Sequence, residues 1–424
     1  MSLKRTATSQ IWSELAIIFL SIYAYSRLSW GNLINNYIWG IILVLSLLLL
    51  AAINLQRGLK IQIDIPLICC TSIIFVYYLW DNQDIAHYGI TISSYFIFNF
   101  VLFLLIRNSR SWHLIAIKMM ILQGLFYTTW TYICIFAPEI YHFFVFPIMQ
   151  DMGFISDVKA GFTAFYGANG LYMSLGLCAY TGYFLFNGEK MKNNKRAILC
   201  LIILIIGMLL SGKRGQALAL CMSFYCLYYF YNSNKKLGRL FKLATITLLG
   251  LLLLYVASFF IPEVMTIIDR FQEQADKDDI STGRFYMWAN AWGVFIQEPL
   301  WGRGWRWFRF SNYTIEDYDV HNVFLQWLVE LGIIGAIPFF IFVAFNSVKV
   351  IKLMIFCRTK SHALSNREVS YISIALLYQI FFLIMCATGT AFYQFECLFP
   401  YILCVCMVHY YSKDRIKNRQ IEGN

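Results

Sequence analysis

Three short polar groupings contain the residue types that could do chemistry in this chain. They are Lys213-Arg214, Arg284 and His321-Asn322. Arginine binds phosphate oxygens in a bidentate manner, and histidine can accept a hydroxyl proton near neutral pH. Such residues suit a site that binds an anion beside a general base. The elements that position them decide whether they can act together.

The composition indicates a polytopic, all-α membrane protein. Of the 424 residues, 59% are hydrophobic and 13% are charged, and the mean hydropathy is +0.60. These values lie outside the range of soluble globular domains. About twelve stretches are long and apolar enough to cross a bilayer as helices of roughly 20 residues. They lie near residues 11–28, 34–54, 62–80, 88–106, 112–136, 162–187, 197–211, 215–232, 241–261, 322–346, 369–387 and 390–411.

The distribution of lysine and arginine predicts the orientation, because both residues favour cytoplasmic loops. Most of the 34 basic residues fall on one side of the predicted membrane, together with both chain ends. We therefore expect both ends in the cytoplasm. The net charge of +11 then reflects topology beside anionic lipid and not nucleic-acid binding. All three polar groupings fall on the opposite, outer side, where cations are unusual.

The loop lengths divide the chain into three regions. Residues 1–261 hold the first nine predicted spans, residues 262–320 form a long outer loop, and residues 321–424 hold the last three spans and a cytoplasmic tail. The strongly aromatic loop is predicted to be ordered, as a cap over the outer end of the bundle. Within it, residues 284–296 are expected to form an amphipathic helix that ends at Glu298-Pro299. A second outer loop, residues 137–160, contains His142, Asp151 and Asp157 and is expected to join this cap.

Other classes of site are disfavoured. The twelve cysteines lie almost entirely inside predicted helices and show neither disulfide nor zinc spacing. The chain has no glycine-rich phosphate loop. We therefore expect no metal centre, no bound cofactor and no nucleotide substrate.

Each polar grouping also has an ordinary structural interpretation. Lys213-Arg214 could be a solvated turn between two spans, and Arg284 could be a surface arginine. Asn322 could be a helix N-cap that accepts hydrogen bonds from backbone amides. Taken singly, none of the three specifies a function.

Together they resemble a known family. The run HNVFLQWLVELGIIG, from His321 to Gly335, resembles the signature of the bacterial O-antigen ligase and O-antigen polymerase superfamily. The turn SGKRG, residues 211–215, resembles the arginine-bearing motif of that superfamily. The stretch TGRFYMWANAWGVFIQEPLWGRG, residues 282–304, resembles its large periplasmic loop.

The resemblance implies a GT-C-like glycosyltransferase of the bacterial inner membrane whose active site faces the periplasm. Its donor would be a glycan on undecaprenyl diphosphate, and it would use no metal. Arg214 and Arg284 would be catalytic residues that bind the diphosphate, with Lys213 as a further phosphate ligand. His321 would be the catalytic base that takes the proton of the acceptor hydroxyl. Nearby arginines would lower its pKa and keep it neutral.

The same resemblance suggests supporting residues. Asn322 would orient the imidazole, and Gly332 and Gly335 complete the motif. Glycan contacts are considered at four positions, for which packing within the cap or an interfacial belt is the alternative. These positions are Trp288, Arg303, Trp305 and Arg306.

Two charged residues fall inside predicted spans. Lys118 and Glu396 could pair within the bundle, or Glu396 could line the cleft. Intramembrane ionisable residues usually have a functional role.

The identity of the acceptor is open. We favour a polymerase of surface polysaccharide, in which the acceptor is another lipid-linked repeat unit and a chain-length regulator is a candidate partner. The alternative is an O-antigen ligase, whose acceptor is the lipid A-core of lipopolysaccharide. A transporter of lipid-linked glycan is the third alternative, but transport sites usually place charges along a central path.

Overall fold

The computed structural model of the chain describes most of the residues that matter for the site. The described residues are 2–30, 36–56, 65–80, 96–107 except 98, 112–145, 147, 161–163, 166–186, 194–231, 283–314, 319–359 and 364–412, with isolated positions at 238, 242, 244–245, 248 and 259. Within these ranges the regular structure is helical and contains no strand. The predicted all-α class is confirmed.

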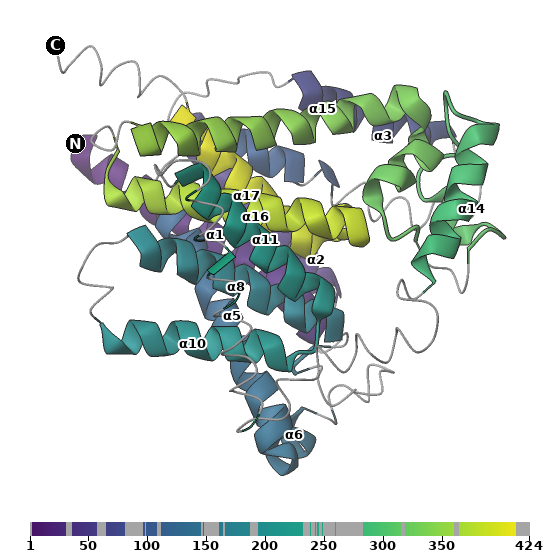
Figure 1. Cartoon of the computed structure of the whole chain (residues 1–424). Helices are drawn as coiled ribbons and strands as arrows, with labels where there is room; N and C mark the ends of the chain where they lie inside the picture. Colours follow the sequence, from purple (N-terminus) through teal and green to yellow (C-terminus); the bar gives the residue numbers. More distant parts are fainter. Residues whose placement is uncertain are drawn as a thin grey trace.

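The helices run side by side as a bundle, and one helix stands across its end (Figure 1). The first part of the bundle contains α1 (Ser2–Trp30), α2 (Asn36–Gln56), α3 (Ile65–Trp80), α5 (His113–Phe136), α6 (Pro138–Phe144), α8 (Tyr166–Phe186), α10 (Lys195–Leu210) and α11 (Arg214–Tyr231). The second part contains α14 (Arg284–Gln297), the 3-10 turn η2 (Trp307–Phe310), α15 (Val323–Thr359), α16 (Asn366–Thr388), the 3-10 turn η3 (Ala391–Tyr393) and α17 (Phe395–Ser412). The start of α1 lies at the end of the bundle opposite α14 (Figure 1).

Five helices among the described residues are long and apolar enough to cross a membrane. They are the segment Ile38–Leu55 of α2, together with α5, α15, α16 and α17, and α3 adds a shorter apolar segment, Ile65–Tyr77. The chain is therefore a helical membrane protein. The predicted spans near 88–106 and 241–261 lie partly or mostly outside the described residues, as do residues 262–282 of the long loop.

The centre of the bundle is formed by α16 and α17. Their apolar windows are 78% and 83% buried, respectively, against 33% for the window in α2. A helix that is apolar on every side belongs in the interior of a bundle. Both helices have one end near α14. The turn that connects them therefore lies at this end of the bundle.

The described part of the long loop is folded. Helix α14 begins and ends within one residue of the sequence prediction, and its C-cap is Glu298. A small apolar cluster joins α14 to η2 and to the start of α15 through Ala291, Val294, Phe308, Val320 and Val329. This cluster gives the loop its own core, separate from that of the bundle.

Helix α15 is interrupted at Gly332, where φ is 62° and ψ is −175°. The break leaves backbone N–H and C=O groups of α15 without partners inside the helix. Residues 299–304 form hydrogen bonds with these groups. Arg303 and Gly304 donate their N–H groups to the carbonyls of Val329 and Glu330, each at 2.9 Å. In return, the N–H of Ile333 donates to the carbonyl of Pro299 at 2.8 Å. The sequence predicted a continuous span over 322–346, so the break and the extension to Thr359 correct that prediction.

Candidate active site

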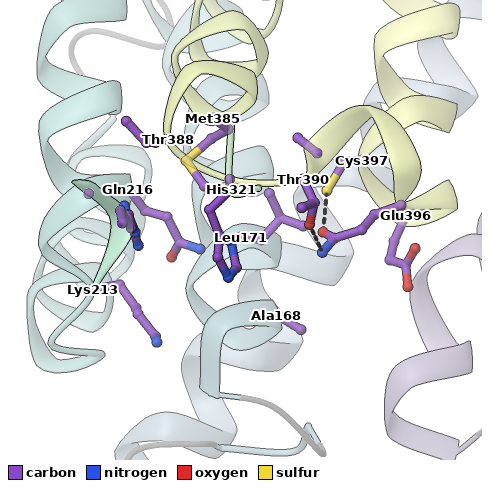
Figure 2. Close-up of a pocket in the computed structure, with 15 residues that line it drawn as sticks. Ala168, Leu171, Lys213, Gln216, His321, Met385, Thr388, Thr390, Glu396 and Cys397 are labelled. Atoms are coloured by element: carbon purple, nitrogen blue, oxygen red, sulfur yellow. Dashed lines mark hydrogen bonds between the residues drawn. The ribbon is translucent and has the colours of Figure 1, made fainter. Parts of the chain in front are cut away.

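All three polar groupings contribute to one cavity, of about 520 Å³, at the end of the bundle near α14. Its lining comes from the ends of α8, α11, α16 and α17, from the start of α14 and from the residue pair before α15. The lining residues are Ala168, Leu171, Lys213, Gly215, Gln216, Arg284, His321, Met385, Thr388, Gly389, Thr390, Ala391, Gln394, Glu396 and Cys397. Figure 2 shows His321 between Lys213 on one side and Glu396 on the other.

The turn between α10 and α11 brings Lys213 to the cavity. Gly212 has a φ of 66°, a conformation that suits glycine, and the Ser211 hydroxyl donates to the Met208 carbonyl at 2.6 Å. The side chains of Lys213 and Gln216 then pack on α8 at Gly170, where a Cβ would collide with both. Gln216 is buried, with 7% of its surface exposed. The hairpin is therefore held against α8 and is not a freely solvated turn.

Arg284 is the first residue of α14. Gly283 precedes it with a φ of 80°, so the chain turns sharply where the helix begins. Burial lowers the pKa of the Arg284 guanidinium, and the positive charge of Arg214 lowers that pKa further. Arg214 begins α11 and is half-buried but does not line the cavity itself. The two arginines are thus close enough to repel each other, as expected for cations gathered to bind an anion.

His321 has a left-handed backbone, with φ at 55°. Such a conformation costs a non-glycine residue on the order of 1–3 kcal/mol and needs support from its surroundings. Residues next to His321 in the sequence provide this support. Asn322 accepts hydrogen bonds from the N–H groups of Phe324 and Leu325 at 3.1 and 3.2 Å. On the other side, Asp319 forms ion pairs with Arg306 and Arg309 at 3.2 and 3.4 Å.

The environment of His321 favours the neutral imidazole. Burial lowers its pKa from the usual 6.5, and the positive charges of Arg284 and Arg309 lower it further. Asp319 acts in the opposite direction and raises it. The arginine effect was predicted from sequence, but burial is the larger cause.

A polar segment between α16 and α17 forms the opposite side of the cavity. The Gln394 side-chain amide donates to the Thr390 hydroxyl at 3.0 Å, and Gln394 Oε1 accepts from the Cys397 thiol at 3.3 Å. Glu396 follows in the first turn of α17 and is partly exposed to the cavity. Of the two alternatives for Glu396, the structure favours lining the cleft, whereas Lys118 is exposed on α5.

A buried ionic network underlies the His321 segment. Gln326 donates from Nε2 to Asp319 at 3.1 Å and to Glu330 at 2.8 Å. Glu330 is fully buried and accepts from the Tyr393 hydroxyl at 2.7 Å. The network therefore links the segment before α15 to η3, which lies on the opposite side of the cavity.

The four residues considered for glycan contact do not line the cavity. Trp305 is buried and stacks on Tyr393 with ring centroids 4.9 Å apart, and Arg306 is buried in its pair with Asp319. Arg303 pairs with Glu298 at 3.0 Å, and Trp288 donates to the Val320 carbonyl at 3.1 Å. Trp305 therefore packs the cap against the bundle, and the other three residues make contacts within the cap.

The remaining motif residues have structural roles. Asn322 caps α15, as its alternative interpretation predicted. A Cβ at Gly332 would overlap the backbone of Leu300 and Trp301. At Gly335 a Cβ would press on Leu331 at 2.8 Å and on Tyr77 of α3 at 3.3 Å. The glycines therefore allow the loop and α3 to approach α15 closely.

Sequence reasoning did not single out Gln216, Gln394 or Asp319. Gln216 lies three residues after Lys213, on the same helix face, which was an available signal. Asp319 lies two residues before His321 and could have been noted as a carboxylate near the base. Gln394 belongs to a stretch predicted to be inside a span, so nothing in the local pattern indicated a cavity.

Comparison with known families agrees with the motif resemblance. Residues 199–340 match a family model described as O-antigen ligase. No curated protein shows significant similarity to the chain. The matched range contains the turn before α11, the start of α14 and the segment before α15, which supply Lys213, Arg214, Arg284 and His321. The region that carries all three polar groupings is therefore similar to the O-antigen ligase family, which supports the resemblance to the O-antigen ligase and polymerase superfamily.

Proposed function

We propose that the chain is a membrane glycosyltransferase that moves a glycan from undecaprenyl diphosphate to a sugar hydroxyl on the periplasmic face. It would act as a polymerase of surface polysaccharide in the bacterial inner membrane. One observation carries the proposal: Lys213, Arg284 and His321, which come from three distant segments, line a single cavity.

The cationic side of the cavity suits a diphosphate. Arg284 and Lys213 line it, and the charge of Arg214 acts at the same place. A guanidinium can donate two parallel hydrogen bonds to a phosphate group. Fixed positive charges would also stabilise the charge that develops on the leaving diphosphate, so the scheme needs no metal ion.

His321 would act as the general base. The acceptor oxygen forms a bond to the anomeric carbon of the donor while the bond from that carbon to the phosphate oxygen breaks. The hydroxyl proton moves to the His321 imidazole, and the electron pair leaves with the lipid diphosphate. This role requires a neutral imidazole, which the lowered pKa of His321 supports. Attack from the side opposite the leaving group inverts the anomeric configuration.

The full architecture belongs to the same proposal. A GT-C-like bundle of about twelve spans would place both chain ends in the cytoplasm and the cavity on the outer side. The described apolar helices and the exposed positions on them are consistent with a surrounding lipid phase.

Purified protein supplied with a lipid-linked donor provides the direct test. The donor is extracted from cells that lack this chain, where it is expected to accumulate. His321→Ala should lower glycan transfer by at least about a hundredfold, since general-base catalysis contributes roughly 10² to 10⁴ in rate. Arg284→Lys should restore only part of the donor binding lost in Arg284→Ala, because an ammonium cannot form the bidentate contact.

Lys352→Ala is the matched control, since Lys352 is exposed in the part of α15 far from Gly332. It should transfer glycan like the unaltered protein. Substantial turnover by His321→Ala would contradict the assignment of the base.

Deletion of the gene separates the polymerase from the ligase. Loss of the polysaccharide ladder, with single repeat units left on lipid A-core, supports the polymerase. Loss of all glycan from the core, with polymer accumulating on the lipid carrier, would identify a ligase. Unchanged surface glycan would contradict both.

A further inference from the structure

The cavity has a charged group that the diphosphate scheme does not use, the Glu396 carboxylate. It lies in the first turn of α17, and that turn is anchored: the N–H groups of Cys397 and Leu398 donate to the Gln394 carbonyl at 3.1 and 2.9 Å. The position of Glu396 is therefore set by the helix start and not by a long loop.

The surroundings of Glu396 suit neutral polar groups and not phosphate. Thr390 and Gln394, which also line the cavity, supply a hydroxyl and an amide group close to the start of α17. The hydrogen bond between Gln394 and Thr390 fixes the direction of the amide. Lys213 and Arg284 also line the cavity, and Figure 2 shows Lys213 and Glu396 on opposite sides of His321.

An ionised carboxylate in a cavity for a diphosphate would weaken donor binding through repulsion. Carboxylates accept hydrogen bonds through two oxygens and can bind two neighbouring sugar hydroxyls at once. Such hydroxyls would lie on the side of His321 that faces away from Lys213, where Figure 2 shows Glu396.

We propose that Glu396, with the Gln394 amide beside it, binds neighbouring hydroxyl groups of the acceptor sugar and holds one of them next to His321. This inference rests on the proposed glycosyltransferase function and extends it, because it divides the cavity into a donor side and an acceptor side. Glu396 is a residue that binds and positions the acceptor, and the proton still moves to His321.

The test measures three properties of full-length protein in lipid nanodiscs. Binding of undecaprenyl diphosphate reports on the donor side alone. Release of glycan to water reports on donor cleavage without a sugar acceptor. Glycan transfer, with lipid-linked donor extracted from cells that lack this chain, reports on both sides. The variants are Glu396→Gln and Glu396→Asp, and the control is Glu139→Gln, because Glu139 is exposed on α6 and does not line the cavity.

Glu396→Gln should reduce transfer about tenfold or more, the amount expected for loss of a charge-assisted hydrogen bond. The same variant should bind undecaprenyl diphosphate at least as tightly as the unaltered protein, since one repulsive charge is gone. Its slow release of glycan to water should be unchanged. Glu396→Asp should retain more transfer than Glu396→Gln, and Glu139→Gln should match the unaltered protein.

Two results would overturn the inference. The first is transfer by Glu396→Gln at the rate of the unaltered protein. The second is a parallel loss of transfer, of release to water and of undecaprenyl diphosphate binding, which would indicate a role of Glu396 in folding or on the donor side. Failure of the unaltered protein to bind undecaprenyl diphosphate and to transfer glycan would instead refute the proposed function. The two failures are therefore distinguishable.

Discussion

At the residue scale, His321 combines an unfavourable backbone with a favourable electrostatic setting. Its left-handed φ of 55° is supported on one side by the Asn322 cap and on the other by the ion pairs of Asp319. A solvated turn would have no need for this support. With this backbone conformation, His321 lines the cavity, and burial and the positive charge of Arg284 lower the pKa of its imidazole.

The pKa of His321 predicts the pH dependence of transfer. The base must be neutral, so activity is lost as the pH falls through its pKa, which lies below 6.5. Replacing Arg284 by Gln removes a positive charge that disfavours the imidazolium. The pKa then rises, and the acidic limb of kcat/KM should move to higher pH, by up to about one unit.

Profiles from about pH 5 to pH 9 measure this shift, with Arg284→Lys as the charge-retaining control. The acidic limb of the Lys variant should stay close to that of the unaltered protein. An acidic limb that stays in place in Arg284→Gln would show that Arg284 has no influence on the base.

The sequence pointed to Lys213, Arg284 and His321, which line the cavity, but to only part of the rest of its lining. Arginine and lysine on the predicted outer side are exceptions to the usual charge bias, so their types and positions alone attracted attention. Glu396 gave only an ambiguous signal and Gln394 gave none, because their position at the cavity depends on where the ends of α16 and α17 meet. Trp305 and Arg306 were considered for glycan contact on residue type, but the structure buries both. Arg306 pairs with Asp319 of the same loop, and Trp305 stacks on Tyr393, which is distant in sequence.

At the element scale, the break in α15 joins the cap to the bundle. Residues 299–304 pair with the backbone on both sides of Gly332, and Tyr77 of α3 donates its hydroxyl to the carbonyls of Trp301 and Leu331. Periodicity alone predicts an uninterrupted apolar helix here, since an isolated glycine is tolerated within a helix. Only the approach of a distant loop shows why the helix must open.

Two glycine substitutions should therefore have opposite effects on stability. Gly332→Ala places a Cβ against the backbone of Leu300 and Trp301 at a positive φ, and should destabilise the protein by about 2 kcal/mol or more. Gly293→Ala adds a Cβ in open space inside α14, and should stabilise that helix by up to about 1 kcal/mol.

Thermal unfolding in detergent, followed by size-exclusion chromatography, measures both effects. Gly332→Ala should lose its monodisperse peak at a lower temperature than Gly293→Ala. Equal midpoints for the two variants would show that the close contact at Gly332 does not contribute to the fold.

At the scale of the whole molecule, the apolar composition predicted the helical membrane class, and the described helices confirm it. Several spans were located well, including α5 and α16. Boundaries near the cavity were less accurate: the last span was predicted from residue 390, but α17 starts at Phe395 after a 3-10 turn. A polar cavity can interrupt a helix over a few residues. Mean hydropathy over a longer window does not detect so short an interruption.

The orientation of the whole chain can be tested with two reporter fusions. Tyr313 lies before α15, and Thr359 is its last residue. Alkaline phosphatase fused after Tyr313 should be active, because it reaches the periplasm. Green fluorescent protein fused after Thr359 should fluoresce, because it stays in the cytoplasm.

The reciprocal fusions provide the controls and should both be inactive. The reverse pattern would invert the proposed orientation and place the cavity in the cytoplasm. The same reporter active at both positions would show that α15 does not cross the membrane.

The backbone pairing at Gly332 has a practical consequence. It joins the cap to α15 without help from the His321 imidazole, so a chain that retains Gly332 and lacks His321 should still fold and keep the cationic residues of the cavity. Such a chain would hold its lipid-linked ligand and release it unchanged. His321→Ala, purified from native membranes, would then serve as bait, and mass spectrometry of the lipids it retains would reveal the composition of the sugar repeat.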